Sequence, residues 1–291
     1  MPAAPRRLLF GTAGVPLSSD DGSTLAALDR VSELGLDGLE IEFVKGVKMG
    51  GETARKVRAK AEAYCLRLSV HAPYFINFNS EDPGVRLHSQ ERLLNSVRVG
   101  AACGAASVVF HAGFYGQASP ERAYAAVRSG VAAVMSIVRT ERLPASVRIE
   151  TMGKRSQFGS LDEILSLCRE IDGLRPCLDF SHIYAREGRV NSYREFQRVL
   201  GKVTRKLGAA ALKNAHIHVA GVHYNHTGEI KHLNLDEADF RYDEWLQALR
   251  DAGVEGFVIC ESPNLETDAL MLKNLYWAQA RKSAAGMRRL G

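Results

Sequence analysis

Histidines and acidic residues stand at the ends of several apolar segments of this chain. Residues 215–220 read AHIHVA, so His216 and His218 share one side of a strand, because side chains two residues apart point the same way. Other segments end in a histidine or a carboxylate. These residues are His71, His111, Glu150, Asp179, His182 and Glu261. Neutral imidazole beside carboxylate is the ligand set of zinc, manganese or iron. The pattern therefore predicts a transition-metal centre.

Burial of so many carboxylates requires a compensating charge. Any one of these residues alone is more often a hydrogen-bonded structural group than a ligand. Several buried carboxylates that converge would repel each other and lose hydration unless a cation neutralises them. One zinc ion takes about four ligands, and at least seven candidates are present. We therefore expect two or three ions, with Glu150, near the middle of the series, as the bridging ligand.

Further ligands are expected around His182. Asp179 and His182 are three residues apart in LDFSH, so they would face opposite ways on a continuous strand. If the strand ends near Phe180, the turn can bring His182 back over the site to serve an outer ion. The loop GVHYNHTGEIKHLNL offers Glu229 and His232 to the same ion. We expect its other two histidines, at 223 and 226, to be solvated.

Eight short apolar, β-branched segments alternate with stretches of helical periodicity. The segments are residues 8–14, 38–44, 66–73, 107–113, 146–153, 175–182, 214–221 and 256–264. Intervening stretches such as TLAALDRVSELG have 3.6-residue apolar spacing, and several end in glycine. This pattern favours a single-domain (β/α)8 barrel over residues 1–291. The alternative is a doubly wound sheet, but no GxGxxG follows the first segment. Active sites of such barrels lie at the carboxyl ends of the strands, where the candidate ligands fall.

Composition limits the classes of protein to consider. The chain has 291 residues, of which 46% are hydrophobic and 24% charged, which is typical of a globular protein. No apolar run reaches the roughly 18 residues of a membrane span, and we expect no membrane association and no secretory signal. Five cysteines without a CxxC pair favour a reducing cytoplasm. The net charge of +5 is compatible with a polyanionic partner.

Basic residues follow three of the predicted strands. They are Lys45 and Lys48 in VKGVKMGG, Lys154 and Arg155 in MGKRSQ, and Arg186 with Arg189 in AREGR. Most lysines and arginines in such loops are solvated charges. Because three separate loops on the same side of the barrel are basic, we interpret them as a rim that faces phosphates.

Six motifs resemble, in their order and spacing, the endonuclease IV family of apurinic/apyrimidinic endonucleases within the xylose-isomerase-like barrel superfamily. They are SVHAPYFINF, VVFHAG, IETMG, CLDFSHIYA, HIHVAG and ICESPN. The resemblance covers nearly the whole chain. It implies a zinc-dependent hydrolase that cleaves double-stranded DNA on the 5′ side of abasic sites in base excision repair. It also implies three zinc ions at the barrel mouth; one site also suits Mn2+. We expect a monomer.

The resemblance also implies a role for each ligand. His71 and His111 would bind one zinc, with Glu150 bridging. Asp179, His218 and Glu261 would bind the second, and His182, Glu229 and His232 the third. Glu150 and Glu261 are the expected catalytic carboxylates. In this family the loop after strand two enters the minor groove at the lesion. Met49 would then fill the abasic gap while Lys45 and Lys48 hold phosphates; the alternative is a surface loop with a partly buried methionine.

Two departures from the family leave alternatives open. Strand seven carries HIHVAG where better-known members have one histidine followed by Asn-Asp; we expect His218 to be the ligand and His216 to lie one strand step deeper. The loop has GEIKH instead of Asp-x-His, so the spacing is one residue longer. Without the third site, the chain could be a two-metal nuclease. It could also be a sugar isomerase or epimerase that holds one metal by Glu150, Asp179, His218 and Glu261. A binding protein without turnover is disfavoured by the cost of unused buried charge.

Overall fold

Eight parallel strands close into a barrel in this computed structural model, which describes residues 7–287, with side chains to residue 280. Their order around the barrel is β1-β10-β7-β6-β5-β4-β3-β2. The strands are β1 (Leu8–Ala13), β2 (Gly38–Glu42), β3 (Arg67–His71), β4 (Ser107–Phe110), β5 (Ser146–Glu150), β6 (Arg175–Asp179), β7 (Ala215–Val219) and β10 (Gly256–Cys260). The prediction of a single-domain (β/α)8 barrel is confirmed.

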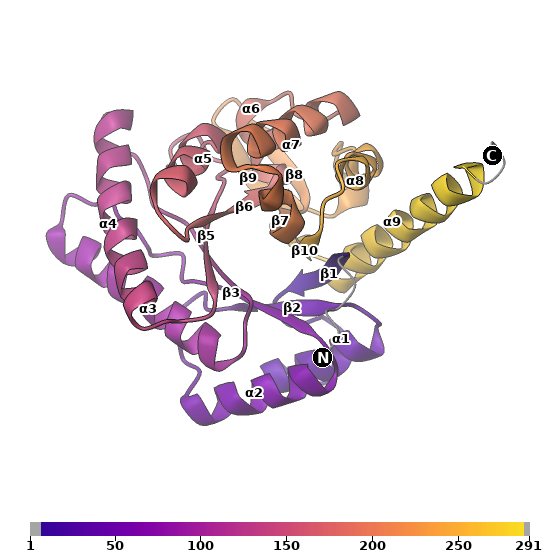
Figure 1. Cartoon of the computed structure of the whole chain (residues 1–291), viewed down its shortest axis with the longest axis horizontal. Coiled ribbons are helices and arrows are strands. Elements are labelled where there is room, and N and C mark those ends of the chain that lie inside the picture. The colour runs from indigo at the N-terminus through magenta and orange to yellow at the C-terminus, as the bar shows by residue number, and fades with distance from the viewer. Residues whose placement is uncertain (1–6, 288–291) are drawn as a thin grey trace.

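Helices lie around the outside of the barrel (Figure 1). They are α1 (Thr24–Glu33), α2 (Gly51–Ala63), α3 (Pro83–Ala102), α4 (Pro120–Thr140), α5 (Leu161–Glu170), α6 (Phe180–Glu187), α7 (Tyr193–Leu207), α8 (Tyr242–Asp251) and α9 (Glu266–Met287), with short 3-10 turns η1 (Ala209–Asn214) and η2 (Leu235–Glu237). Several begin at a side chain that accepts a backbone N–H, such as Ser23, Asp82 and Ser119. Among the described residues, no helix has the length and apolar character that a bilayer span requires.

The barrel interior is filled by side chains. A Cβ at Gly38 would lie 2.0 Å from the Arg67 carbonyl oxygen and 2.7 Å from the Phe257 ring, so glycine is needed there. At the amino ends of the strands, the buried Arg148 donates hydrogen bonds to Ser107 Oγ and to two backbone carbonyl oxygens. These contacts close the barrel at the amino ends of the strands. The accessible mouth of the barrel is therefore at the carboxyl ends.

A two-stranded antiparallel hairpin follows β7 at this mouth. It consists of β8 (Gly221–Asn225) and β9 (Gly228–Leu233), where the sequence had indicated a loop. The hairpin is anchored on the segment after β5: the Arg155 N–H donates to the Thr227 carbonyl at 3.0 Å, and the Glu229 N–H donates to the Gly153 carbonyl at 3.2 Å. This contact brings β9 over the carboxyl ends of β5 and β6.

Candidate metal centre

The predicted ligands meet at the mouth of the barrel. His71, Glu150 and Asp179 are the last residues of β3, β5 and β6. His111 directly follows β4, and Glu261 directly follows β10. Period-two alternation turns these side chains inward, and closure of the barrel brings them together from strands that are far apart in the sequence.

The first set of ligand atoms surrounds one oxygen of Glu150. His71 Nε2 lies 3.2 Å and His111 Nε2 lies 3.1 Å from Glu150 Oε2. The other ring nitrogen of His71 donates to the Ala72 carbonyl at 2.8 Å, which fixes the ring and leaves Nε2 free as a ligand. This arrangement can hold one ion.

The second set uses the other oxygen of Glu150. His218 Nδ1 lies 3.2 Å from Glu261 Oε1 and 3.6 Å from Glu150 Oε1, and Asp179 completes the group within 4.8 Å. Glu150 therefore belongs to both sets, as a bridging carboxylate would. Asp179 also accepts the His182 backbone N–H at 2.7 Å, so α6 begins directly at the end of β6.

The third set forms above this turn. His182 Nε2 lies 3.2 Å from Glu229 Oε2 and 3.4 Å from His232 Nε2. His182 Nδ1 donates to the Thr151 carbonyl at 3.0 Å, so Nε2 faces the other two side chains. The structure thus brings all nine predicted ligands into three adjoining sets.

A β-bulge explains how the longer spacing between Glu229 and His232 still serves one site. His223 pairs with Lys231 and Tyr224 pairs with Glu229, so Ile230 is an extra residue on β9. An extra residue reverses the alternation of faces, and two residues three apart then point the same way. Gly153 makes room for them, because a Cβ there would lie 2.8 Å from Glu229 Cβ and 2.9 Å from His182 Cδ2.

The chemistry of these side chains fits transition-metal ions. Within the described part of the chain, Glu150 Oε1, Asp179 Oδ2 and His218 Nδ1 are buried and make no hydrogen bond. Buried polar atoms without partners are costly, and these three point toward other ligand atoms. Imidazole nitrogens mixed with carboxylate oxygens suit zinc or manganese. An ion in the second set would satisfy these atoms.

Protons compensate the carboxylates when metal is absent. Burial acts to lower the pKa of His71, but its contact with Glu150 and the charge of Glu42 raise it to about 10. Burial likewise acts to raise the pKa of Glu261, yet nearby His218 brings it to about 2. Burial raises the pKa of Asp179 to about 7. The site therefore favours positive charge, which metal ions would supply in place of protons.

Two buried carboxylates on β2 were missed from the sequence. Glu40 lies between His216 and His218. Its Oε2 atom lies 2.9 Å from His216 Nε2, and its Oε1 atom lies 2.9 Å from His218 Nε2. Glu42 makes no hydrogen bond within the described structure, and burial raises its pKa to about 8. The segment GLEIEFV places both glutamates on one face, by the same period-two rule that singled out the two histidines.

The predicted phosphate-binding residues differ in availability. Lys45, Lys48, Lys154 and Arg155 are exposed at the surface. The first two line a cavity of about 360 Å³ together with Glu42, and the other two line a cavity of about 550 Å³ beside Glu229. Met49 is half-buried, and its sulfur lies 3.3 Å from Cys103 Sγ. That contact favours the alternative of a partly buried methionine over a free tip.

Arg186 is already engaged by the protein. Its guanidinium donates to the carbonyl oxygens of Met152, Lys154 and Gln157 and to Tyr115 Oη. These bonds hold the segment after β5 in place, so Arg186 supports this segment instead of offering a free charge to a phosphate.

Exposed aromatic side chains follow two strands that carry candidate ligands, and the sequence analysis did not single them out. Tyr74 and Phe75 follow β3, and Phe114 follows β4; all three are more than 40% exposed. The Tyr74 ring lies 5.1 Å from the His71 ring and 5.3 Å from the His111 ring. The sequence could have indicated them, because these aromatic residues come shortly after two strand ends that carry candidate ligands.

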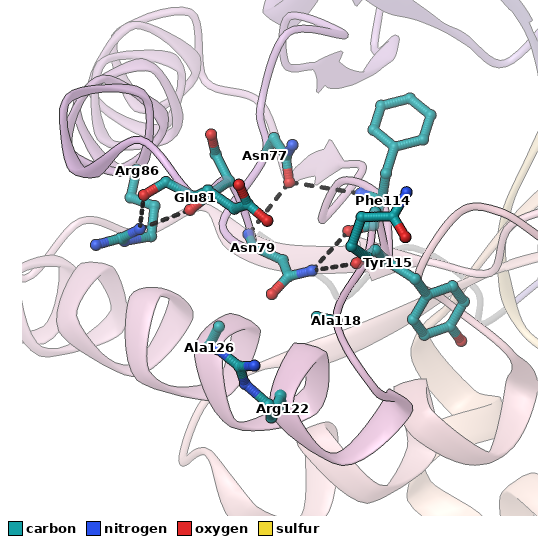
Figure 2. Close-up of a pocket in the computed structure, with 12 residues that line it drawn as sticks. Asn77, Asn79, Glu81, Arg86, Phe114, Tyr115, Ala118, Arg122 and Ala126 are labelled. Atoms are coloured by element: carbon teal, nitrogen blue, oxygen red, sulfur yellow. Dashed lines mark hydrogen bonds between the residues drawn. The ribbon is translucent and has the colours of Figure 1, made fainter.

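Asparagine side chains connect these two aromatic loops. Figure 2 shows Asn79 donating to the carbonyl oxygens of Phe114 and Tyr115, and Asn77 accepting the backbone N–H groups of Asn79 and Phe114. A cavity of about 680 Å³ lies beside them, with Arg86 and Arg122 at its edge. The bonds couple the loop after β3 to the loop after β4, so the aromatic rings are held by a connected frame.

Fold and site together define a TIM barrel with a cluster of histidine and carboxylate side chains at its mouth that could hold metal ions. The sequence matches the xylose isomerase-like TIM barrel family over residues 28–289, and the chain belongs to that family.

Relatives by sequence fall into two groups. The chain is 42% identical to the uncharacterized protein MJ0133 of Methanocaldococcus jannaschii over 270 residues, which cover 92% of this chain and 97% of that protein. It is 31% identical to a probable endonuclease 4 of a Geobacillus species over 51% of this chain and 50% of that protein. A probable endonuclease 4 of Streptomyces avermitilis is 27% identical over 71% of this chain and 68% of that protein.

Solved structures share the fold. A D-tagatose 3-epimerase-like protein has a TM-score of 0.75 at 17% identity and covers 95% of this chain and 99% of its own. Endonuclease IV from Thermus thermophilus has a TM-score of 0.70 at 19% identity, and the match covers 94% of this chain and 100% of that structure's chain. At these identities the likeness establishes the barrel and no specific activity.

Proposed function

We propose that this protein is a zinc-dependent apurinic/apyrimidinic endonuclease that hydrolyses the phosphodiester 5′ to abasic sites in double-stranded DNA. The observation that carries the proposal is the set of His182, Glu229 and His232, added to the sets around Glu150. A single-metal isomerase needs only four of the nine ligands. The additional five, of which His71 and His182 are buried and the others half-buried, would be a costly accumulation of polar groups without further ions. The partial likeness to endonuclease 4 sequences favours the same function.

Clustered divalent ions lower the pKa of a bound water and neutralise phosphate oxygens during an in-line displacement. The chain's own contribution is to place the ligands. Glu150 joins two sets, and Glu261 contributes a carboxylate that His218 holds ionised. We propose three zinc ions per chain; Mn2+ would also suit one of the sites.

The surroundings of the centre suit DNA. Lys45, Lys48, Lys154 and Arg155 form a basic rim at the surface that can contact phosphates on either side of the mouth. The aromatic rings of Tyr74 and Phe75 offer stacking surfaces for exposed bases or a deoxyribose. We propose that the enzyme acts in base excision repair in the cytoplasm, as a monomer.

A sugar epimerase is the second candidate. It is favoured by the set of Glu150, Asp179, His218 and Glu261, which alone can hold one ion, and by likeness in fold to a D-tagatose 3-epimerase-like protein. In this function, two carboxylates would exchange a proton with adjacent carbons of a ketose. The outer set around His182 would then have no role.

A direct assay separates the two candidates. A labelled duplex with one tetrahydrofuran abasic analogue is incubated with the zinc-loaded protein and with Glu261→Gln. We expect cleavage on the 5′ side of the analogue, no cleavage of the intact duplex, and at least a hundredfold slower cleavage by the variant. Failure to cut the duplex at full zinc content, together with epimerisation of a ketohexose, would overturn the proposal.

A further inference from the structure

We infer that Glu40 is a positioning residue that fixes His218 for metal binding through Nδ1. The inference rests on the proposed metal centre. Glu40 is fully buried on β2, one strand step below Glu42 at the mouth. Its carboxylate meets two imidazoles: Oε2 lies 2.9 Å from His216 Nε2, and Oε1 lies 2.9 Å from His218 Nε2.

The short contact determines which nitrogen of His218 carries the proton. The contact of Glu40 with His216 is an aligned hydrogen bond, whereas that with His218 is short but not aligned as one. A lone pair on Nε2 at 2.9 Å from a carboxylate oxygen would be repelled. In the neutral ring, the form that binds metal, the proton is therefore held on Nε2, and the lone pair lies on Nδ1, the atom that faces Glu261 and Glu150.

His218 differs in this respect from other histidines of the centre. His71, His182 and His232 each place Nδ1 against a backbone carbonyl and turn Nε2 toward the ligands. His218 does the reverse, and its anchor is a charged side chain. An anchoring carboxylate fixes the ring and increases the basicity of the metal-binding nitrogen. Among the candidate ligands, Glu40 thereby contacts His218 of the second set directly.

His216 completes the arrangement from below. It donates one N–H to Glu40 and so holds the carboxylate against His218. Cys177 also lies beside both histidines. Burial raises the pKa of the Cys177 thiol well above its ordinary range, so this group is a neutral neighbour and not a thiolate ligand. The polar layer beneath the mouth is therefore a support for the second set.

Glu40→Gln is the sharpest variant because it keeps the size of the side chain. A carboxylate can accept an N–H from both imidazoles, whereas an amide can accept from one and must turn its NH2 toward the other. Ser69→Ala is the matched control: Ser69 pairs with Glu40 in register on β3, is equally buried, and makes no hydrogen bond through its side chain in the described structure.

Two measurements test the inference. Zinc is titrated into metal-free protein against a chelator, and the ions bound are counted by native mass spectrometry. We expect Glu40→Gln to bind one ion about tenfold to a hundredfold more weakly and to keep the others, while Ser69→Ala matches the wild type. Equal affinities for all ions in Glu40→Gln and wild type would overturn the inference.

The second measurement needs neither metal nor a folded Glu40 variant. Two-bond 1H–15N spectra of histidine-labelled, metal-free wild type, recorded at a pH high enough that the His218 ring is neutral, identify the nitrogen that keeps its proton, assigned against His218→Gln. We expect the Nε2–H form; an Nδ1–H form would overturn the inference. Wild type that takes up no zinc would defeat the proposed function, and these spectra would still decide the role of Glu40.

Discussion

Gly153→Ala should disable the third metal set while leaving the barrel folded. The added Cβ would lie 2.8 Å from Glu229 Cβ and 2.9 Å from both Glu229 Oε2 and His182 Cδ2. Ordinary van der Waals contact between such atoms needs roughly 3.5 to 4 Å, so these groups must move away from the new Cβ by about 0.6 to 1.2 Å. The carboxylate and imidazole of one set would then no longer converge. A misplacement of this size costs about a hundredfold in rate when the geometry is catalytic.

The assay compares Gly153→Ala with Gly22→Ala. Gly22 lies in the exposed segment between β1 and α1, and a Cβ there would meet no atom within 4 Å. We expect Gly153→Ala to bind one zinc ion fewer and to cleave abasic duplex about a hundredfold more slowly, with a far-ultraviolet spectrum like that of wild type. Gly22→Ala should be unchanged. Full zinc content with wild-type turnover in Gly153→Ala would refute the role assigned to the third set.

Further expectations concern the deeper histidine, the basic rim and pH. His218→Ala should lose one zinc ion and most activity. His216→Ala should mainly lower the free energy of unfolding, by about 1–3 kcal/mol, because it leaves the Glu40 carboxylate without this partner. Chelator titration and thermal unfolding check this, and loss of metal in His216→Ala alone would reverse the assignment. Lys45→Ala with Lys48→Ala should weaken binding to abasic duplex and reduce its salt dependence by roughly one slope unit per lost phosphate contact; an unchanged slope would exclude this loop from DNA binding. Because the pKa of His71 is about 10 in the metal-free protein, above its ordinary value, the ring is protonated at neutral pH and zinc must displace that proton. Zinc affinity should therefore rise with pH, by about tenfold per pH unit for each proton displaced, and calorimetry in buffers of different ionisation enthalpy should detect proton release; no release would contradict it.

The barrel and the convergence of most candidate ligands at its mouth were predictable because both depend on local periodicity. Alternation in the strands fixes which side chains turn inward, and barrel closure then brings strand ends such as His71 and Glu261 together without knowledge of any contact. The strand before His182 ends at Asp179, one residue from the predicted point, because the Asp179 side chain caps the helix that follows.

Other features depend on contacts between distant segments. The bulge at Ile230 arises where the hairpin docks on Gly153, and GEIKH alone does not contain that information. The engagement of Arg186 by three backbone carbonyls likewise needs the folded loop. Glu40 is a different case, since the alternation rule would have placed it on the inward face, had the charged residues of GLEIEFV been weighed as the histidines of AHIHVA were.

The number of zinc ions per chain tests the central claim most directly. Purified protein, stripped of metal and reconstituted with zinc, is desalted and measured by inductively coupled plasma and native mass spectrometry. Three adjoining ligand sets predict about three zinc ions per chain, with Gly153→Ala holding about two. A wild-type value of about one, unchanged in Gly153→Ala, would contradict the trinuclear centre and favour a single-metal epimerase.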